Sequence, residues 1–495
     1  MTKRILSLLL VVIMAFSSVL LVSCNGEEEE SSGTASEVGD TAGFLNEKKD
    51  FGGETIKILT YANRNFSTCQ IAPEELVDEA VSDAFYERNA IIEENYGIKI
   101  EVETEDDQNT IADTIRLNCQ SNLDEYQAVV TGIVYMAPLG VEGFLYDFNS
   151  IDNGYLHLDK EWWDQTIMQD ISINDKIWFL SGDALVEDDE STWAIYFNKE
   201  LIKSYDLEDP YQLVRDGAWT LDKMHELASK VHKQNGSTKS YDPDVGDVWG
   251  LLAQSYDYYA FMLGGDQPMV DNTGDEPRLR VDEEENYNTF YTVYDIMLDD
   301  KNTGVADFFG SWNSGVYGQK TQIFANGNAL FMPGAISTVS EEVMRNAEIK
   351  YGILPMPKRS DLQDDYTTSV TVYWCSVFSI PLSNVEKLDA TCYALEAMAF
   401  YGKKLVTPEY YDRTLTYKRF QDDESRDMLD LIFRNRTYDL GGIFNFGDTG
   451  GGNGTLYFYT NLLGAKSNAI VSEYEKYSGA YQTALDALIE QANKE

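Results

Sequence analysis

The stretch Phe324–Ser337, FANGNALFMPGAIS, decides the fold. Asn326–Asn328 has the small and polar residues of a tight turn. Ala329–Met332 follows as a short apolar run, which predicts a buried strand. Pro333 and Gly334 should end this strand, because proline lacks the N–H that a ladder needs and glycine admits positive φ.

The next residues continue the alternation of helix and strand. A helical segment is expected around Ser340–Ala347, and Tyr351–Leu354 predicts a second strand that Pro355 and Pro357 close. Taken alone, this order predicts one αβ unit of an α/β domain.

Earlier in the chain, strands and helices alternate as they do in a parallel sheet. Strands are expected over 55–61, 98–102 and 126–134, with a helix opened by Pro73 and another near Ile111–Cys119 between them. Such a βαβαβ series implies a parallel sheet covered by helices. The first turn carries no GxGxxG, so a dinucleotide fingerprint is absent.

Composition limits the kinds of partner. The 495 residues suffice for more than one hydrophobic core, and 43% of them are hydrophobic. Aromatic residues make up 13% of the chain; most should lie in the core, but amphipathic rings also suit a groove for a polar ligand. The formal net charge of −46 argues against binding to nucleic acid and to anionic lipid.

Residues 1–23 have the features of an export signal. A basic start precedes the apolar run Ile5–Val22, which is also long enough for a single transmembrane anchor. The sequence Leu21-Val22-Ser23-Cys24 at the end of the run resembles a bacterial lipobox, which implies cleavage before Cys24 and acylation of its thiol. Residues 24–50 are acidic and poor in apolar residues, as in a disordered tether.

The segment Tyr196–Val231, YFNKELIKSYDLEDPYQLVRDGAWTLDKMHELASKV, predicts a strand, a helix and a second helix capped by Thr220. Together with residues 324–358, it resembles the extracellular solute-binding proteins, family 1, the sugar-type receptors of ABC importers. The resemblance covers residues 54–494. It implies an α/β fold of the type II periplasmic-binding-protein kind, with two lobes, each a sheet flanked by helices, joined by hinge crossings.

The resemblance also implies an organisation and a function. Lobe 1 would contain residues 51–186 and 357–407, and lobe 2 residues 187–356 and 408–495, with the ligand bound between them. The protein would capture a carbohydrate, with an oligosaccharide favoured, and deliver it to the permease subunits of an ABC transporter. It would be a monomer, held by lipid on the extracytoplasmic face of the cell membrane, and would need no catalysis and no cofactor.

The acidic cluster Glu187–Glu190 has several interpretations. Clustered carboxylates bind metals or form the acid/base pair of a glycosidase. The alternating ligands and the glycine turn of a calcium loop are missing, and a solvated loop is the ordinary alternative. The resemblance places the cluster at the cleft, where Asp188 and Asp189 would accept hydrogen bonds from sugar hydroxyls. A lipid-anchored glycoside hydrolase that uses a carboxylate pair remains the alternative function.

The resemblance assigns further ligand-binding positions to strand ends and loops that would face the cleft. These are Asn63, Arg64, Tyr135, Gln254, Tyr256, Gly334, Asn445 and Phe446. The family often has an aromatic residue after the Pro-Gly turn, whereas this chain has Ala335 and Ile336, which puts one stacking platform in doubt. Trp193 and Tyr373-Trp374 are predicted to belong to the core, and a platform for stacking on a sugar is the alternative.

Other motifs of catalysis or metal binding are absent from the sequence. There is no Ser-His-Asp order and no GxSxG elbow. The glycine-rich run Gly447–Thr455 lacks the Lys-Ser/Thr of a phosphate loop and predicts a flexible loop. The cysteines show no CxxC or Cys–His spacing, so no metal site is predicted.

Overall fold

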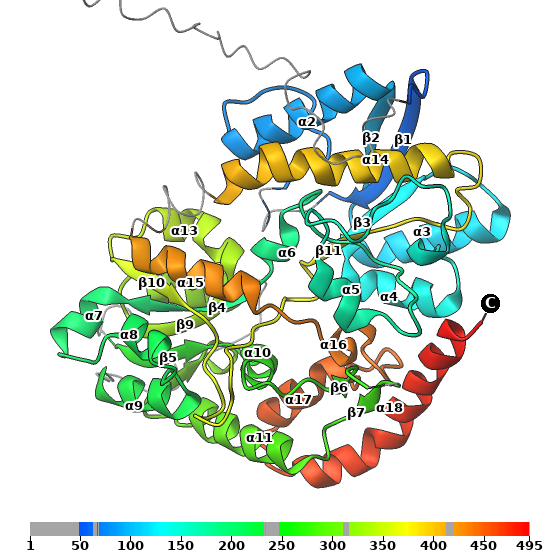
Figure 1. Cartoon of the computed structure of the whole chain (residues 1–495). Helices are drawn as coiled ribbons and strands as arrows, with labels where there is room; N and C mark the ends of the chain where they lie inside the picture. The colour runs from blue at the N-terminus through cyan, green and yellow to red at the C-terminus, as the bar shows by residue number, and fades with distance from the viewer. Residues whose placement is uncertain are drawn as a thin grey trace, which may run out of the picture. The chain divides into compact units, whose positions relative to one another are not determined.

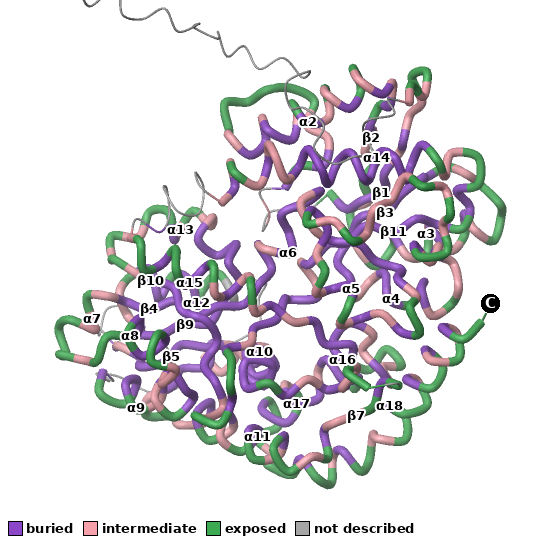
Figure 2. The backbone as a smooth tube through the Cα atoms, in the orientation of Figure 1, coloured by how far each residue is buried: buried purple, intermediate pink, exposed green. Residues whose placement is uncertain are grey.

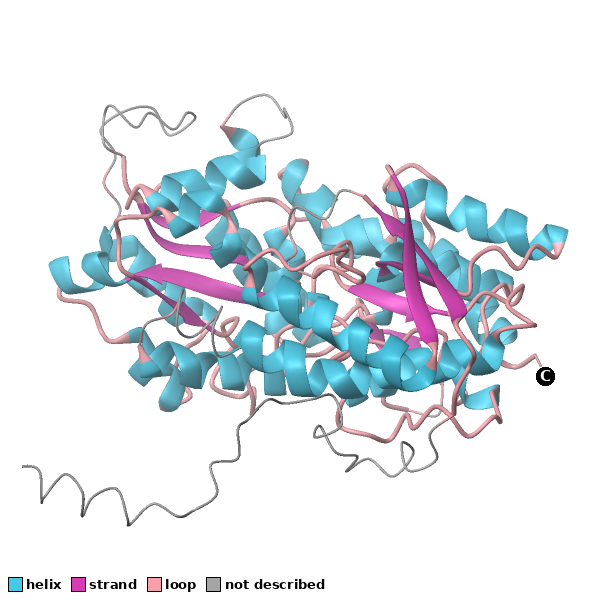
Figure 3. Cartoon of the chain, turned by 90° about the horizontal axis from the view of Figure 1, so that it is seen from above, coloured by secondary structure: helices cyan, strands magenta, loops and turns pink. Residues whose placement is uncertain are grey.

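The structure is a computed structural model that describes residues 49–62, 67, 69–231, 233, 247–274, 276–309, 316–411, 420 and 422–494. Residues 48–495 form one compact unit. This unit contains two main sheets, which appear as separate groups of strands when the chain is seen from above (Figure 3). The predicted export signal lies outside the described residues.

The first sheet is formed by β1 (Glu54–Tyr61), β2 (Ile98–Glu105), β3 (Ala128–Gly132) and β11 (Ser376–Ser379). Its order is β11-β3-β1-β2. β1 pairs in parallel with β2 and β3, which confirms the parallel sheet predicted for this region, and β11 joins β3 antiparallel. The last strand of this sheet therefore comes from a part of the chain far from the other three.

The second sheet is formed by β4 (Trp193–Asn198), β5 (Trp249–Ala253), β8 (Thr303–Val305), β9 (Ala329–Ala335) and β10 (Tyr351–Leu354). Its order is β10-β4-β9-β5-β8, with β9 at the centre. A short ribbon of β6 (Val270–Asp271) and β7 (Arg278–Leu279) stands apart from both main sheets. The strand predicted over 351–354 is thus confirmed as β10.

Helices pack on both sheets. In the first half of the chain they are α2 (Ala80–Tyr96), α3 (Gln108–Ser121), α4 (Ile133–Glu142), α5 (Gln165–Ile171), α6 (Glu187–Glu190), α7 (Lys199–Ser204), α8 (Pro210–Arg215) and α9 (Leu221–Val231). In the second half they are α10 (Asp257–Gly264), α11 (Glu284–Met297), α12 (Val316–Ala325), α13 (Glu342–Arg345), α14 (Leu388–Tyr401), α15 (Asp423–Arg434), α16 (Leu440–Phe444), α17 (Phe458–Gly464) and α18 (Ile470–Ala492). Short turns of helix are η2 (Phe148–Ser150), η4 (Ala306–Phe308), η5 (Ile336–Ser340), η6 (Gly402–Val406) and η8 (Thr455–Tyr457).

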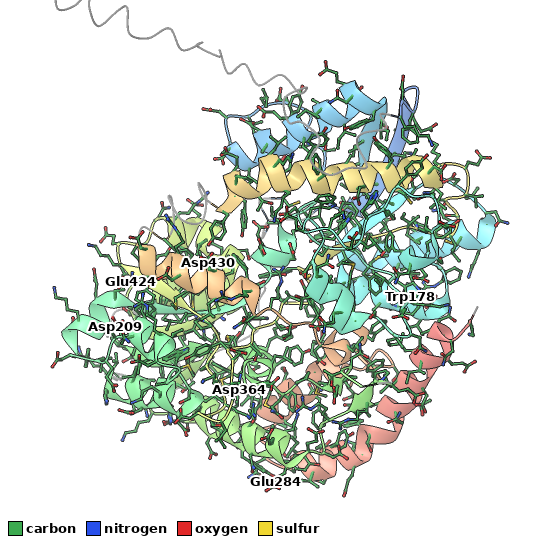
Figure 4. The ribbon with its side chains drawn as sticks, viewed as in Figure 1. Trp178, Asp209, Glu284, Asp364, Glu424 and Asp430 are labelled. Atoms are coloured by element: carbon green, nitrogen blue, oxygen red, sulfur yellow. The ribbon has the colours of Figure 1, made fainter. Side chains whose placement is uncertain are left out.

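The helices cover the sheets in two sets. α2, α3 and α14 pack on the first sheet, and α7, α8, α9, α12 and α15 pack on the second (Figure 1). α16 and α18, near the C-terminus, contact α4, and α18 also contacts α11. Buried residues concentrate along the strands, whereas exposed residues follow the outer helices (Figure 2). Acidic residues such as Asp209, Glu284, Glu424 and Asp430 lie exposed at the periphery (Figure 4).

The end of β9 differs from the sequence prediction. The strand runs to Ala335 and includes Pro333 and Gly334, which were expected to end it. The pairing of β9 with β5 reaches only Phe331, whereas the pairing with β4 continues to Ala335. Pro333 therefore lies where β9 has one neighbouring strand, and a missing N–H is tolerated there.

The predicted start of α9 is confirmed. Thr220 Oγ1 accepts a hydrogen bond from Lys223 N at 3.2 Å, as an N-cap residue does. The helix buries Leu221, Met224, Leu227, Ala228 and Val231. Trp219, fully buried before the cap, donates from Nε1 to the carbonyl of Pro355 at 3.0 Å. This contact fastens α9 to the end of β10.

Two chain segments that leave the sheets run side by side between them. Trp193 N donates to Ser369 O at 2.8 Å, and Thr371 N donates to Ser191 O at 2.9 Å. A third segment joins them, because Thr437 N donates to the carbonyl of Thr368 at 2.8 Å. These segments link the first sheet, the second sheet and the C-terminal helices.

We expect Gly250→Ala to destabilise the protein. An ideal Cβ on Gly250 of β5 would lie 2.2 Å from the carbonyl oxygen of Ala228 on α9. The helix must then move off the strand, and overpacking of this kind costs about 1–3 kcal/mol. Urea unfolding measures the change.

Gly479→Ala is the matched control. Gly479 lies inside α18, and a Cβ there would meet nothing within 4 Å. This substitution should raise stability by about 0.5–1 kcal/mol, because alanine favours helix. Equal midpoints for both variants would show that the close packing of α9 on β5 is absent in solution.

Candidate ligand-binding site

Aromatic side chains from both sheets meet at the segments that connect them. Tyr135 lies in α4, directly after β3 of the first sheet, and Tyr256 lies in the turn after β5 of the second. The ring of Tyr373 lies between them, with its centroid 5.9 Å from that of Tyr135 and 6.0 Å from that of Tyr256. The structure thus brings two predicted ligand residues to one tyrosine that the sequence placed in the core.

Two more residues complete this group. The ring of Trp193 lies 5.9 Å from that of Tyr256, and the hydroxyls of Tyr373 and Tyr457 are hydrogen-bonded to each other. We call Tyr135, Trp193, Tyr256, Tyr373 and Tyr457 the aromatic cluster. Its four tyrosines are half-buried, so each ring keeps part of its surface accessible.

Burial keeps the phenols of Tyr135, Tyr256 and Tyr373 neutral. It raises the pKa of Tyr135 to about 12 and raises the pKa values of Tyr256 and Tyr373 above the ordinary value of a tyrosine. These hydroxyls therefore remain hydrogen-bond donors at neutral pH. Trp193 is 3% exposed, and its Nε1 has no hydrogen-bond partner in the described part of the chain. Because a buried N–H is normally hydrogen-bonded, the indole N–H of Trp193 is available to an acceptor atom of a ligand.

The backbone positions Tyr135 and Tyr373 opposite each other. α4 begins at Ile133, whose N–H donates to the carbonyl of Cys375 at 2.9 Å. The next N–H, that of Val134, donates to the carbonyl of Val372 at 3.3 Å. The first turn of α4 is therefore held by the segment that carries Tyr373.

Gln254 and Gly334 lie at the ends of two central strands of the second sheet. Gln254 follows β5, and its N–H donates to Asp257 Oδ2 at 2.8 Å. Gly334 lies within β9, opposite Ala194 of β4. A Cβ on Gly334 would lie 3.0 Å from Thr338 Oγ1 and 3.2 Å from the ring of Tyr196, so this position packs closely against η5 and β4.

Asn445 and Phe446 shape the loop that leads to Tyr457. Asn445 ends α16 in the left-handed region, and its Oδ1 accepts from Leu456 N at 3.1 Å. Phe446 is 2% exposed and stacks on Phe444 with ring centroids 5.9 Å apart. Both predicted residues therefore hold the loop that leads to Tyr457.

Asp188 and Asp189 form ion pairs with an arginine from a distant part of the sequence. Arg436 reaches Asp188 Oδ2 at 3.0 Å and Asp189 Oδ1 at 2.8 Å. It also reaches Oδ2 of Asp164, the N-cap of α5, at 2.8 Å. The two predicted carboxylates lie in a helix, α6, with three of its four residues buried, and do not form a solvated acidic loop. This group of one arginine and three aspartates is called the Arg436 cluster below.

The Arg436 cluster carries more negative than positive charge. Burial raises the pKa of Asp188 to about 7. Burial also opposes ionisation of Asp164, but Arg436 and the hydroxyl of Tyr438 hold its pKa below the usual range. A polar cavity of about 160 Å³ borders Asp188, Asp189 and Arg436. The assignment of Asp188 and Asp189 to the ligand site remains a prediction.

Several predictions cannot be placed in this geometry. Asn63, Arg64 and Cys24 lie outside the described residues. Within the described ranges, no group of three or more His, Cys, Asp or Glu side chains is arranged to hold a metal ion. Cys119, Cys375 and Cys392 are free thiols.

The sequence matches a known family over most of its length. The profile of the bacterial extracellular solute-binding protein family matches residues 73–374. The chain belongs to this family. Its members are binding proteins and not enzymes, so the hydrolase alternative is not favoured. Among curated proteins, none matches the sequence.

Solved structures share the fold of this solute-binding protein. UgpB from Mycobacterium tuberculosis, in complex with glycerophosphocholine, is 14% identical, with a TM-score of 0.57 over 88% of this chain and 99% of that one. An ABC transporter solute-binding protein from Agrobacterium radiobacter, in complex with ribitol, is 14% identical, with a TM-score of 0.54 over 88% of this chain and 100% of that one. The GacH receptor of Streptomyces glaucescens, solved without ligand and with acarbose, is 13% identical, with a TM-score of 0.54 over 88% and 99% of the chains.

These similarities confirm the predicted two-lobe α/β fold. They also agree with an extracytoplasmic solute-binding protein, the class to which the family belongs. In the described part of this chain, helices with the length and apolar character needed to span a bilayer are absent.

We expect Arg436→Met to destabilise the protein strongly. The variant leaves Asp164, Asp188 and Asp189 without their counter-ion, and breaking a buried ion pair costs about 3–5 kcal/mol. Asp188→Asn should cost much less, because Arg436 keeps two carboxylates and the local excess of negative charge falls. Urea unfolding of both variants measures these differences.

The raised pKa of Asp188 predicts that the stability of the wild-type protein depends on pH. Folded Asp188 keeps its proton up to about pH 7, whereas an unfolded aspartate loses it near its ordinary pKa of 3.8. The folded state thus binds more protons in this interval, so the free energy of unfolding falls as pH rises from about 4 to 7. Asp188→Asn should flatten this slope. An identical slope in both proteins would show that Asp188 is ionised throughout.

Proposed function

We propose that this protein captures a carbohydrate at the aromatic cluster and delivers it to the permease subunits of an ABC transporter. The observation that carries the proposal is the meeting of Tyr135 and Tyr256 on Tyr373. Because these rings come from elements of both sheets, a ligand that touches them contacts both lobes. Such a ligand favours whichever arrangement of the lobes lets it make both contacts.

The chemistry of the cluster suits a neutral polyhydroxylated solute. Flat aromatic faces pack against the C–H patches of a sugar, and phenol and indole groups supply hydrogen bonds to its oxygens. Among the described residues, no lysine or arginine lies over a ring of the cluster. The strong negative charge of the chain also disfavours an anionic solute. The ribitol and acarbose complexes of proteins with the same fold agree with this class of ligand.

The remaining predicted positions form the surroundings of this site in the proposal. Gln254 and Gly334 would line it from the second sheet, and Asn63 and Arg64 from the loop after β1. Asn445 and Phe446 support the loop that carries Tyr457. The contacts of Asp188 and Asp189 with Arg436 favour a role in joining the connecting segments.

The proposal includes attachment to the membrane. Cleavage at the lipobox would leave Cys24 as a lipidated N-terminus, and residues 24–50 would form the tether to the folded unit. The protein would act as a monomer on the extracytoplasmic face. This arrangement overcomes the repulsion that its negative charge creates at an anionic membrane surface.

We expect Tyr256→Ala and Tyr373→Ala each to weaken carbohydrate binding by about ten-fold or more, which corresponds to about 1.4 kcal/mol. Each variant removes a ring that contacts two others of the cluster. A thermal-shift screen of neutral mono- and oligosaccharides identifies the ligand, and calorimetry then measures the affinities.

Tyr205→Ala is the control, because Tyr205 is 40% exposed at the end of α7 and should not affect binding. Unchanged affinity in both cluster variants would remove the aromatic cluster from the site. Release of shorter sugars by the pure wild-type protein would support the hydrolase alternative.

We expect Cys24→Ala to abolish lipid attachment. The thiol is the acceptor in the predicted lipobox, so labelled palmitate should enter the wild-type protein and not the variant. Cys69→Ala should retain the label, because Cys69 is buried in the folded unit. Wild-type protein without label would favour a signal that is cleaved without lipidation, or an uncleaved apolar anchor.

A further inference from the structure

A buried ion pair lies beneath the predicted ligand residues of the second sheet. Lys320 of α12 and Asp257 of α10 are both fully buried, and Lys320 Nζ lies 3.0 Å from Asp257 Oδ2. The same ammonium donates to the carbonyl oxygen of Pro333 in β9 at 2.7 Å. Fully buried lysines are rare and are normally paired, so this position needs an explanation.

Asp257 holds the turn that carries Tyr256. Its Oδ2 accepts from Gln254 N at 2.8 Å, in addition to the ammonium of Lys320. The next N–H of the turn, that of Ser255, donates to Asp307. Two carboxylates therefore fix the backbone just before Tyr256, and Lys320 anchors one of them.

Pro333 lies at the part of β9 that faces Trp193. Ala335, two residues further on, pairs with Trp193 of β4, and Pro333 pairs with Ile195. A shift of this end of β9 would therefore be transmitted to Trp193. Because the ring of Trp193 lies 5.9 Å from that of Tyr256, Lys320 connects the supports of two neighbouring rings of the aromatic cluster.

Stability alone does not account well for this pair. Replacing a buried ion pair by apolar residues of similar size is often neutral or stabilising. In addition, Asp257 Oδ1 is buried and has no hydrogen-bond partner among the described residues, which costs further stability. What the pair does provide is a fixed geometry, because the Lys320 ammonium joins the turn after β5 to the end of β9.

We propose that Lys320 is a positioning residue for solute binding, which joins Asp257 to the Pro333 carbonyl and so sets Tyr256 against Trp193 and Tyr373. This inference rests on the proposed function, because it takes the aromatic cluster as the ligand site. Lys320 itself does not touch the ligand. Its effect passes through the turn at residues 254–257 and the strand end at residues 333–335.

The test compares Lys320→Met with the double variant Lys320→Met/Asp257→Asn. The single variant leaves a buried carboxylate unpaired and should lose both stability and affinity. The double variant removes that charge and keeps an acceptor for Gln254 N, so we expect stability to recover. Affinity should stay at least ten-fold below wild type, because the link to the Pro333 carbonyl is still missing.

The probes are ribitol, maltose and maltotetraose, measured by calorimetry, with amide hydrogen exchange of residues 250–257 and 329–336 measured without ligand. Exchange in these segments should be faster in both variants than in wild type. Lys320→Arg, which keeps a cation in place, should recover part of the affinity. Lys199→Met is the control, because Lys199 pairs with Asp422 at 2.7 Å on the other side of the second sheet and should change neither measurement.

Two results would overturn the inference. If the double variant regains wild-type affinity together with stability, the pair is only structural. If exchange at residues 254–257 is unchanged in both variants, Lys320 does not hold the turn. A wild-type protein that binds none of the probes would count against the carbohydrate proposal, and the exchange measurement would still decide the role of Lys320.

Discussion

The pairing of Ser191–Trp193 with Ser369–Thr371 is the constraint on which the rest of the structure depends. Its two backbone hydrogen bonds, at 2.8 and 2.9 Å, join the segment that enters the second sheet to the segment that leaves it. Because Trp193 begins β4 and Tyr373 follows the paired residues, this pairing brings both rings to the junction of the sheets. The aromatic cluster therefore forms at the place where the chain passes between the lobes.

Charge secures the same junction from a third segment. Arg436, which follows α15, binds the N-cap of α5 and two carboxylates of α6, so one guanidinium joins this third segment to two helices that precede β4. A single cation among three carboxylates leaves an excess of negative charge. Burial, together with the neighbouring carboxylates, raises the pKa of Asp188. Polar contacts thus join the connecting segments beside the aromatic cluster.

Local patterns were enough to predict much of the fold. The alternation in β1 and β2, the prolines that close β10 and the cap at Thr220 are local signals, and the structure confirms these elements. The end of β9 was predicted wrongly, because tolerance of Pro333 depends on how far β5 extends alongside it. The partner of Asp188 lies 248 residues away, and no local signal indicates that distance. Tyr135 and Tyr256 were assigned from the family resemblance, and the structure brings both to Tyr373. Tyr373 was predicted in the core and Tyr457 was not singled out, because their meeting depends on contacts between distant segments.

The late arrival of β11 has a consequence for how the chain folds. The five strands of the second sheet all lie between residues 193 and 354, so this sheet can form from one continuous stretch. One edge of β3 stays uncovered until β11 pairs with it, beginning with Ser376 opposite Gly132. As the chain is synthesised from its N-terminus, the first sheet thus exposes an open strand edge until about three-quarters of the sequence is present, which invites wrong pairing. The second sheet is thus inserted between strands of the first, which is completed last.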